Sequence, residues 1–266
     1  MEPYIFQKII FNDGLINDSI DATYIIHLED NGRIEHIKEQ LLEYHPTNIV
    51  YILFNKGYKN SIKKSFINSP PLDLIDAFLI IFKHTIKYNY NNILILEDDF
   101  IFSKKIKEKE HIDIINKTIK KLEDTDFIYL LGCFPYLQIP YDLYNYRVLS
   151  TGMHAVIYSY KNRINTLNYK QELIKDWDIY NFQNINRFTY YIPLCYQLFY
   201  ETENSKVWAK DINIVLYLLS KVLLNIFKLV KLDKQIEPGT TIFYYISKYL
   251  LWIIIVIIII FYNKRK

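Results

Sequence analysis

The chain has few cysteines, the residues that hold small disulfide-rich or zinc-binding folds together. It contains 2 cysteines and 6 glycines in 266 residues, too few thiols for a disulfide framework or a four-thiolate zinc site. Lysine and arginine (32) nearly balance aspartate and glutamate (29), and the net charge of +3 is too small for a nucleic-acid binder that works by bulk charge. Neither Gly-x-x-x-x-Gly-Lys nor Gly-x-Gly-x-x-Gly occurs, so P-loop and dinucleotide-binding interpretations have no support.

Apolar residues are abundant instead, at 51% against 23% charged residues, which excludes an intrinsically disordered chain. The chain is long enough to bury a hydrophobic core that is stable without disulfides or structural metals. From the changes in composition we place an N-terminal extension at 1–20, the main folded domain at 21–210, a basic helix and linker at 211–240 and a membrane anchor at 241–266.

The longest apolar run covers residues 249–262 and extends back to Ile242, with one serine and Lys248 as its interruptions. A bilayer core needs about 20 helical residues. Lys248 lies near one end, where a lysine can snorkel to the headgroups, and three cations at 264–266 follow the other end. We therefore expect a single-pass transmembrane helix; a very hydrophobic core element is the alternative.

Ahead of this run, residues 212–232 carry polar side chains at helical spacing, namely Lys221, Asn225, Lys228 and Lys231. This pattern is typical of a basic amphipathic helix on a membrane surface, or of a helix packed on the domain with a lysine-rich exposed edge. Because these lysines lie on the domain side of the anchor, the positive-inside tendency predicts a cytoplasmic domain. The first 15 residues have no long apolar core, so we expect no signal peptide.

Short apolar runs alternate with helical patterns between about residues 20 and 210. The predicted strands are 23–28, 48–54, 92–96 and 127–131, and the predicted helices are 33–44, 72–88 and 111–122. Strands that alternate with helices indicate an α/β fold with a mainly parallel sheet and helices on both faces. In such sheets ligands bind at the carboxyl ends of the strands.

Three adjacent carboxylates, Glu97, Asp98 and Asp99, directly follow the third of these strands. In extended chain, residues i and i+2 point the same way, so Glu97 and Asp99 are expected to share one face. Three neighbouring anions repel each other, and Mg²⁺ or Mn²⁺, which prefers oxygen ligands, would relieve that repulsion. The alternative is a solvated turn, where aspartate is common.

The residues around this cluster resemble a known family. Ile95-Leu96-Glu97-Asp98-Asp99-Phe100 is similar to the hydrophobic-Glu-Asp-Asp signature of glycosyltransferase family 25, which contains lipopolysaccharide-type and collagen galactosyltransferases. Other segments resemble the family in its order: 24–33, 72–88, 151–159, 161–167, 176–180 and 192–197. The resemblance covers about residues 22–200 and marks a divergent member.

The resemblance implies a glycosyltransferase-A-type fold and a metal-dependent enzyme that moves a sugar from a nucleotide-sugar donor, a UDP-sugar, to an acceptor hydroxyl with inversion. The acceptor would be a glycan, a protein or a lipid. Mn²⁺ or Mg²⁺ would be held by Asp99 with Glu97 or Asp98 assisting, and would neutralise the diphosphate leaving group.

A separate carboxylate must deprotonate the acceptor hydroxyl. Asp178 matches the family's later aspartate and is our predicted base, with Asp176 in reserve. If their segment is helical, the two side chains point about 200° apart, so only one can face the site.

The resemblance also implies that His27, Arg33, Gly152 and His154 contact the donor. For His154 a satisfied histidine at the end of a strand is the alternative. At the level of function, two alternatives remain: an inactive membrane-anchored binding or scaffold protein on the same fold, or another metal-dependent nucleotide-sugar or phosphoryl-transfer enzyme. An active enzyme should bring Asp99 and Asp178 together at one open cleft.

Overall fold

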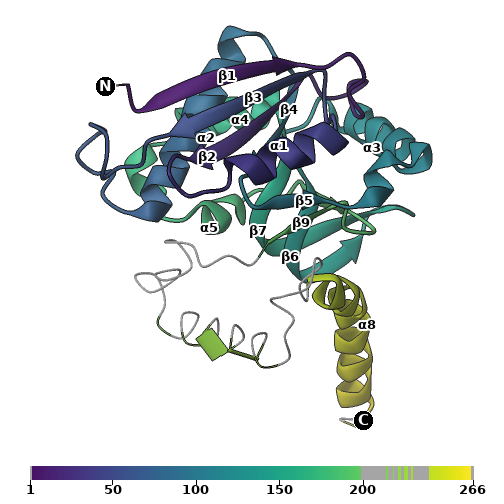
Figure 1. Ribbon diagram of the computed structural model, residues 1–266. Coiled ribbons are helices and arrows are strands. Elements are labelled where there is room, and N and C mark those ends of the chain that lie inside the picture. The colour runs from purple at the N-terminus through teal and green to yellow at the C-terminus, as the bar shows by residue number, and fades with distance from the viewer. Residues whose placement is uncertain are drawn as a thin grey trace.

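The computed structural model describes residues 2–198, isolated positions between 214 and 229, and residues 240–264. Most of the amphipathic helix expected within 211–240 lies outside the described residues. The principal elements, in chain order (Figure 1), are β1 (Tyr4–Ile10), β2 (Ala22–Leu28), α1 (Ile34–Glu43), β3 (Ile49–Asn55), α2 (Pro70–Lys87), β4 (Asn92–Glu97), β5 (Phe100–Phe102), α3 (Lys109–Leu122), β6 (Ile128–Pro140), β7 (Asn145–Ser159), α4 (Tyr160–Asn168), α5 (Trp177–Asn181), β8 (Arg187–Tyr190), β9 (Cys195–Gln197) and α8 (Thr240–Lys264).

One sheet of seven strands forms the centre, in the order β1-β3-β2-β4-β7-β6-β8. Strands β3, β2 and β4 are parallel neighbours, whereas β7 is antiparallel to both β4 and β6. Strand β8 is parallel to β6, and β1 is antiparallel to β3. Five strands therefore point one way, as expected of a mainly parallel sheet, and the two reversed strands β1 and β7 make it mixed.

Helices cover both faces of this sheet, as the sequence predicts (Figure 1). Along β4, Leu94 and Leu96 pack on the face covered by α1 and α3, while Ile93 and Ile95 pack on the face covered by α2. Successive side chains of a strand point to opposite faces. A continuous apolar run is therefore the pattern expected for a strand buried on both sides.

The first strand lies in the segment that the sequence analysis treats as an N-terminal extension. Residues 4–10 pair with β3 over its whole length, from Tyr4 opposite Asn55 to Ile10 opposite Ile49. Exposed and partly buried side chains alternate along most of β1, as expected for an edge strand with one wet face. This segment is therefore a strand of the sheet.

Strand β6 continues past the predicted end at residue 131 and reaches Pro140. The glycine and prolines that look like a strand end are instead accommodated by register irregularities against β7. At Gly132 an added Cβ would lie 1.8 Å from the carbonyl oxygen of Cys195. The glycine thus allows the β9 segment to cross β6 at close range.

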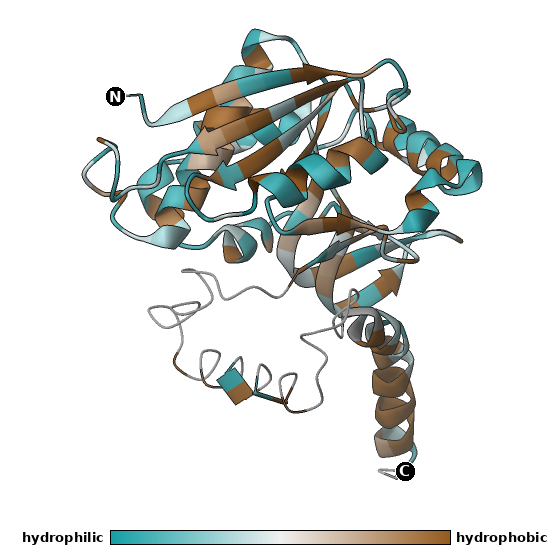
Figure 2. Ribbon diagram, viewed as in Figure 1, coloured by the Kyte–Doolittle hydropathy of each residue, from teal (hydrophilic) through white to brown (hydrophobic). Residues whose placement is uncertain are grey.

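Helix α8 projects away from the domain, and its apolar surface is continuous in Figure 2. Residues Tyr244–Asn263 have a mean hydropathy of 2.3, are mostly exposed, and are long and apolar enough to cross a membrane. The helix packs against β6 at its first turns. From Tyr249 onward the helix is therefore not an element of the core, whereas Tyr244 in its first turns belongs to it.

Candidate functional site

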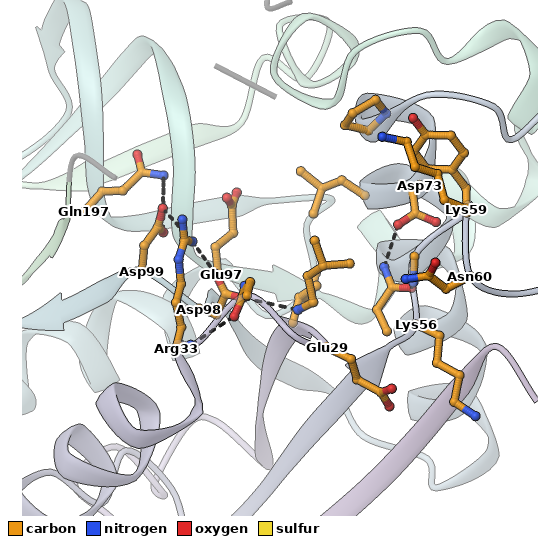
Figure 3. A pocket seen from close by; sticks show the side chains of 18 residues that line it. Glu29, Arg33, Lys56, Lys59, Asn60, Asp73, Glu97, Asp98, Asp99 and Gln197 are labelled. Carbon is orange, nitrogen blue, oxygen red and sulfur yellow. Dashed lines mark hydrogen bonds and ion pairs between the residues drawn. The ribbon is translucent and has the colours of Figure 1, made fainter. Parts of the chain in front are cut away.

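A cavity of about 490 Å³ opens at the carboxyl ends of the three parallel strands β2, β3 and β4 (Figure 3). The loops that follow these strands, at residues 28–33, 55–60 and 97–99, supply most of its lining. Carboxyl ends of parallel strands meet at one edge of a sheet, and ligands bind there in open α/β sheets. The predicted location of the site is therefore the location of a real cavity.

The loop after β2 folds back over the loop after β4. Asp30 and Gly32 have φ angles of 62° and 75°, a left-handed conformation that lets the chain reverse within a few residues. The backbone N–H of Arg33 donates to Oδ1 of Asn31 at 3.0 Å. This turn directs the side chains of Asn31 and Arg33 toward Asp98.

Asp98 is the most thoroughly bound carboxylate of the site. It accepts from Asn31 Nδ2 and Arg33 Nη1, both at 2.5 Å, from the Leu28 N–H at 3.2 Å, and from His27 Nδ1 at 3.3 Å. Burial acts to raise its pKa, but His27, Arg33 and Asn31 hold the pKa below its usual range. These four donors match the acceptor capacity of a carboxylate. Three of these bonds end on Oδ2 and one on Oδ1, so Asp98 mainly holds the β2–α1 loop in place, and its metal role stays a prediction.

Glu97 and Asp99 are bound much less completely. Asp99 is buried and accepts from Gln197 Nε2 at 3.2 Å, with Arg33 Nη1 at 3.5 Å. Burial and the neighbouring Asp98 charge raise the pKa of Asp99 to about 7. Burial, followed by the charges of Asp99 and Asp178, raises the pKa of Glu97 well above its usual range. The fold therefore holds a pair of carboxylates that repel each other.

Among the described residues, no three His, Cys, Asp or Glu side chains are grouped so that they could hold a metal ion. Mg²⁺-type sites often use only one or two carboxylates, with substrate phosphates and water as the other ligands. Glu97 and Asp99 fit such a site, because a bound cation would offset the burial and the neighbouring negative charges that raise their pKa values. Asp99 with Glu97 assisting therefore stays the predicted set of metal ligands.

Asp176 and Asp178 make different contacts, and their assignment as bases stays a prediction. Asp176 is the N-cap of α5, and its Oδ1 accepts from the Ile179 N–H at 2.9 Å. Asp178 accepts from the backbone N–H of Gly152 at 3.1 Å. Burial and the Asp176 charge raise the pKa of Asp178 to about 6. Asp178 does not line the cavity, but its charge acts on Glu97, so the two carboxyls are electrostatic neighbours.

Arg187 is a charged residue near Asp178 that sequence reasoning missed. It is buried, and its Nη2 donates to the Ser150 carbonyl oxygen at 2.8 Å. Its charge lowers the pKa of Asp178, while its Nε and Nη1 have no hydrogen-bond partner among the described residues. A cation in this low-dielectric setting favours the ionised form of the carboxyl.

The predicted donor contacts are only partly brought to the cavity. Arg33 lines it, whereas His27, Gly152 and His154 do not. His27 positions Asp98, and Gly152, with φ 69°, presents its N–H to Asp178. The ring of His154 is buried between the carbonyl oxygens of Gly152 and Cys195, at 2.9 and 3.2 Å. This is the arrangement of a satisfied histidine at a strand, the alternative named above.

The wall opposite the carboxylates carries residues that were not singled out from the sequence. Lys56 and Lys59, on the loop after β3, line the cavity together with Asp73 of α2. Asp73 is neutralised in a buried ion pair with Lys63 and accepts from Asn55 Nδ2 at 2.8 Å. The sequence could have indicated these lysines, because Asn55-Lys56-Gly57 directly follows a predicted strand and belongs at the same sheet edge.

Similarity of this chain to known proteins is found among solved structures. No family model and no curated protein matches it. Three similar solved structures are A197 from STIV (12% identity, TM-score 0.42, 68% of this chain and 86% of that one), a glycosyltransferase involved in the glycosylation of the major capsid of PBCV-1 (10%, 0.37, 72% and 98%) and HddC from Yersinia pseudotuberculosis (13%, 0.33, 73% and 80%). At these TM-scores the likenesses carry no argument about function, and membership of glycosyltransferase family 25 stays a prediction.

Proposed function

We propose that this protein is a glycosyltransferase that moves a sugar from a nucleotide-sugar donor to an acceptor hydroxyl. The observation that carries the proposal is one cavity with two kinds of charge. The repelling pair Glu97 and Asp99 lies at one end, and Lys56 and Lys59 lie at the other (Figure 3). A nucleoside diphosphate suits such a cavity, because its phosphates can contact lysines and share a divalent cation with carboxylates.

The size and chemistry of the cavity agree with this ligand class. Its volume of about 490 Å³ falls in the range of about 300–1,000 Å³ typical of small-molecule sites. Glu97 and Asp99 would hold Mn²⁺ or Mg²⁺, which supplies charge neutralisation for a diphosphate leaving group. Arg33, fixed by Asp98, places a further positive charge beside Asp99.

Asp178 is the residue that would accept the proton of the acceptor hydroxyl. Its pKa of about 6 keeps it ionised at neutral pH, yet basic enough for proton transfer. The Gly152 N–H orients the carboxylate. Because Asp178 lies outside the cavity lining and acts on Glu97, the acceptor would approach from the Asp178 side of Glu97. Inversion, a UDP-linked donor and a galactosyl-type sugar follow only from the family resemblance.

The different-class alternative is an inactive binding protein on the same fold. Two observations favour that alternative. Asp98 is held by four hydrogen bonds within the protein, and Asp178 lies outside the cavity lining. Such a protein would bind the nucleotide without turning it over.

The test is a turnover assay on the full chain in detergent, with a panel of nucleotide-sugars. We expect release of a nucleoside diphosphate from one donor, and only with Mn²⁺ or Mg²⁺ present. Asp99→Asn should abolish release, whereas Glu35→Gln, at an exposed α1 side chain paired with Lys38, should not change it. Full activity in excess chelator contradicts the metal role. Metal-dependent nucleotide binding without any turnover supports the inactive alternative.

We also propose that α8 anchors the protein in a membrane as a single span. Its apolar surface is exposed from Tyr249 onward, and an exposed apolar surface of this size requires a partner such as lipid. Full-length protein should remain in the membrane pellet after extraction with alkaline carbonate. Release of the protein by carbonate contradicts the anchor.

A further inference from the structure

The base of α8 is built into the folded domain. Tyr244 is fully buried, and its hydroxyl bonds to Thr189 Oγ1 at 2.5 Å and to the carbonyl oxygen of Tyr190. In addition, Nε2 of Gln138 in β6 donates to the Tyr244 carbonyl oxygen at 2.6 Å and to Ser247 Oγ at 2.8 Å. These buried hydrogen bonds fix the direction in which the helix leaves the domain.

Lys248 marks the level at which the helix leaves. Its Nζ donates to the Tyr191 carbonyl oxygen and lies between 5.0 and 5.7 Å from the ring centroids of four tyrosines: Tyr146, Tyr191, Tyr244 and Tyr245. Tyrosines gather at the boundary between membrane and water, where their rings are half apolar and half polar. A lysine at the same level keeps its charge out of the hydrocarbon.

The helix beyond this level is short for a bilayer. From Tyr249 to Lys264 it extends about 24 Å at ~1.5 Å per residue, whereas the hydrocarbon core is about 30 Å thick. The residues before Tyr249 cannot slide outward, because Tyr244 and Ser247 are bonded to the sheet. A short span is accommodated by local thinning of the bilayer, by snorkelling of flanking residues and by a domain that lies close against the membrane surface.

The β6–β7 hairpin contacts α8 at the point where the helix leaves the domain, and residues 141–144 form the tip of this hairpin. Gln138 contacts Tyr244 and Ser247, whereas Tyr146, which lies opposite Pro140, contacts Lys248. The helix thus runs toward the tip as it leaves. Leu143 at the tip is 78% exposed, so an apolar side chain is available there for contact with the bilayer.

We propose that the tip of the β6–β7 hairpin is a second membrane contact, with Leu143 inserted at the headgroup layer of the bilayer that α8 crosses. The proposal rests on the anchor proposed above and is independent of the glycosyltransferase assignment. A lipid surface is the occupant that the structure favours, because the tip is continuous with the tyrosines and Lys248 at the base of the helix. The hairpin and α8 would together hold the domain in one orientation on the membrane.

The test places a polarity-sensitive fluorophore on the full chain in lipid vesicles. Leu143→Cys is compared with Leu42→Cys, a matched leucine on α1 that is 81% exposed. Both native cysteines are buried, so labelling is selective. With a quencher attached to the lipid headgroup, we expect several-fold stronger quenching and a blue-shifted emission at position 143, and solvent-like behaviour at position 42.

The outcomes separate the two levels of the proposal. If alkaline carbonate releases the protein from the membrane, both the α8 anchor and the hairpin contact are refuted. If the protein stays integral but position 143 behaves like position 42, the hairpin contact alone is overturned. If position 143 is shielded only by another copy of the chain, detected as crosslinking between Leu143→Cys molecules without lipid quenching, the surface is a protein interface and the lipid contact is refuted.

Discussion

Arg33 Nη1 lies 2.5 Å from Oδ1 of Asp98 and 3.5 Å from Oδ2 of Asp99, so one guanidinium serves two carboxylates of different function. It satisfies the carboxylate that holds the β2–α1 loop in place. It also leaves the other only partly compensated, beside Glu97. Within a run of three acidic residues, one carboxylate is therefore well compensated and the other two are not.

Removal of the Arg33 charge should destabilise the protein, because it leaves the buried Asp98 carboxylate without its cation. For Arg33→Met we expect a loss of about 3–5 kcal/mol in the free energy of unfolding, measured by urea denaturation. Arg33→Lys should lose less, since it keeps the charge but not the fork geometry. A change below about 1 kcal/mol for Arg33→Met would show that Asp98 does not depend on this pair.

Metal binding should be visible without any turnover. Added Mn²⁺ should raise the unfolding temperature of the full chain, since a ligand at 100 times its Kd stabilises by about 2.7 kcal/mol. Asp99→Asn should abolish this rise because it removes one of two ligands, whereas the matched Glu35→Gln variant should keep it. An equal rise in wild type and Asp99→Asn would place the metal elsewhere.

The two aspartates of α5 should separate chemistry from stability. Asp178→Asn should lower kcat by about 10²–10⁴-fold with donor affinity unchanged, because the acceptor proton loses its destination. Asp176→Ala should instead cost about 1 kcal/mol of stability through loss of the N-cap, with turnover largely kept. The reverse result, with normal turnover in Asp178→Asn and none in an Asp176 variant, would exchange the two assignments.

The pH profile should report Asp178. A base must be deprotonated, so kcat/KM should fall as pH decreases below about 6, the value to which burial and Asp176 raise the pKa of Asp178. Arg187→Gln removes a cation that favours the carboxylate, so the midpoint should move to higher pH. Asp176→Asn removes an anion and should move it to lower pH. An unmoved midpoint in both variants would mean that another group limits the reaction.

The natural glycosylation sequon Asn116-Lys117-Thr118 is a poor reporter of membrane topology. Asn116 is buried, and its Oδ1 accepts from Ser19 Oγ at 2.6 Å. Ile62→Thr creates a sequon at the exposed Asn60. In a eukaryotic cell we expect this site to stay unglycosylated and the domain to be digested by protease added to intact microsomes, because the lysines beside the anchor favour the cytoplasm. A glycan at Asn60 would place the domain in the lumen.

Much of the architecture could be predicted because periodicity is local. The runs at 23–28 and 92–96 became β2 and β4, and the helical spacing at 111–122 became α3. The prediction failed at β1 and at the second half of β6. Edge strands and bulged strands have weak hydrophobicity patterns, because they are stabilised by pairing with strands that lie far away in the sequence.

By itself the sequence determined that three carboxylates stand at the end of a buried strand, because covalent order places Glu97, Asp98 and Asp99 after residues 93–96. It also determined that residues 249–262 form a surface that water does not favour. Only the tertiary structure decided which carboxylate is neutralised, because Arg33 and Asn31 reach Asp98 through the fold of another loop. It likewise decided how much of α8 stands clear of the domain, because hydrogen bonds with Gln138 and Thr189, distant in sequence, hold its first turns on the sheet. Charge compensation and burial depend on groups that only folding brings together.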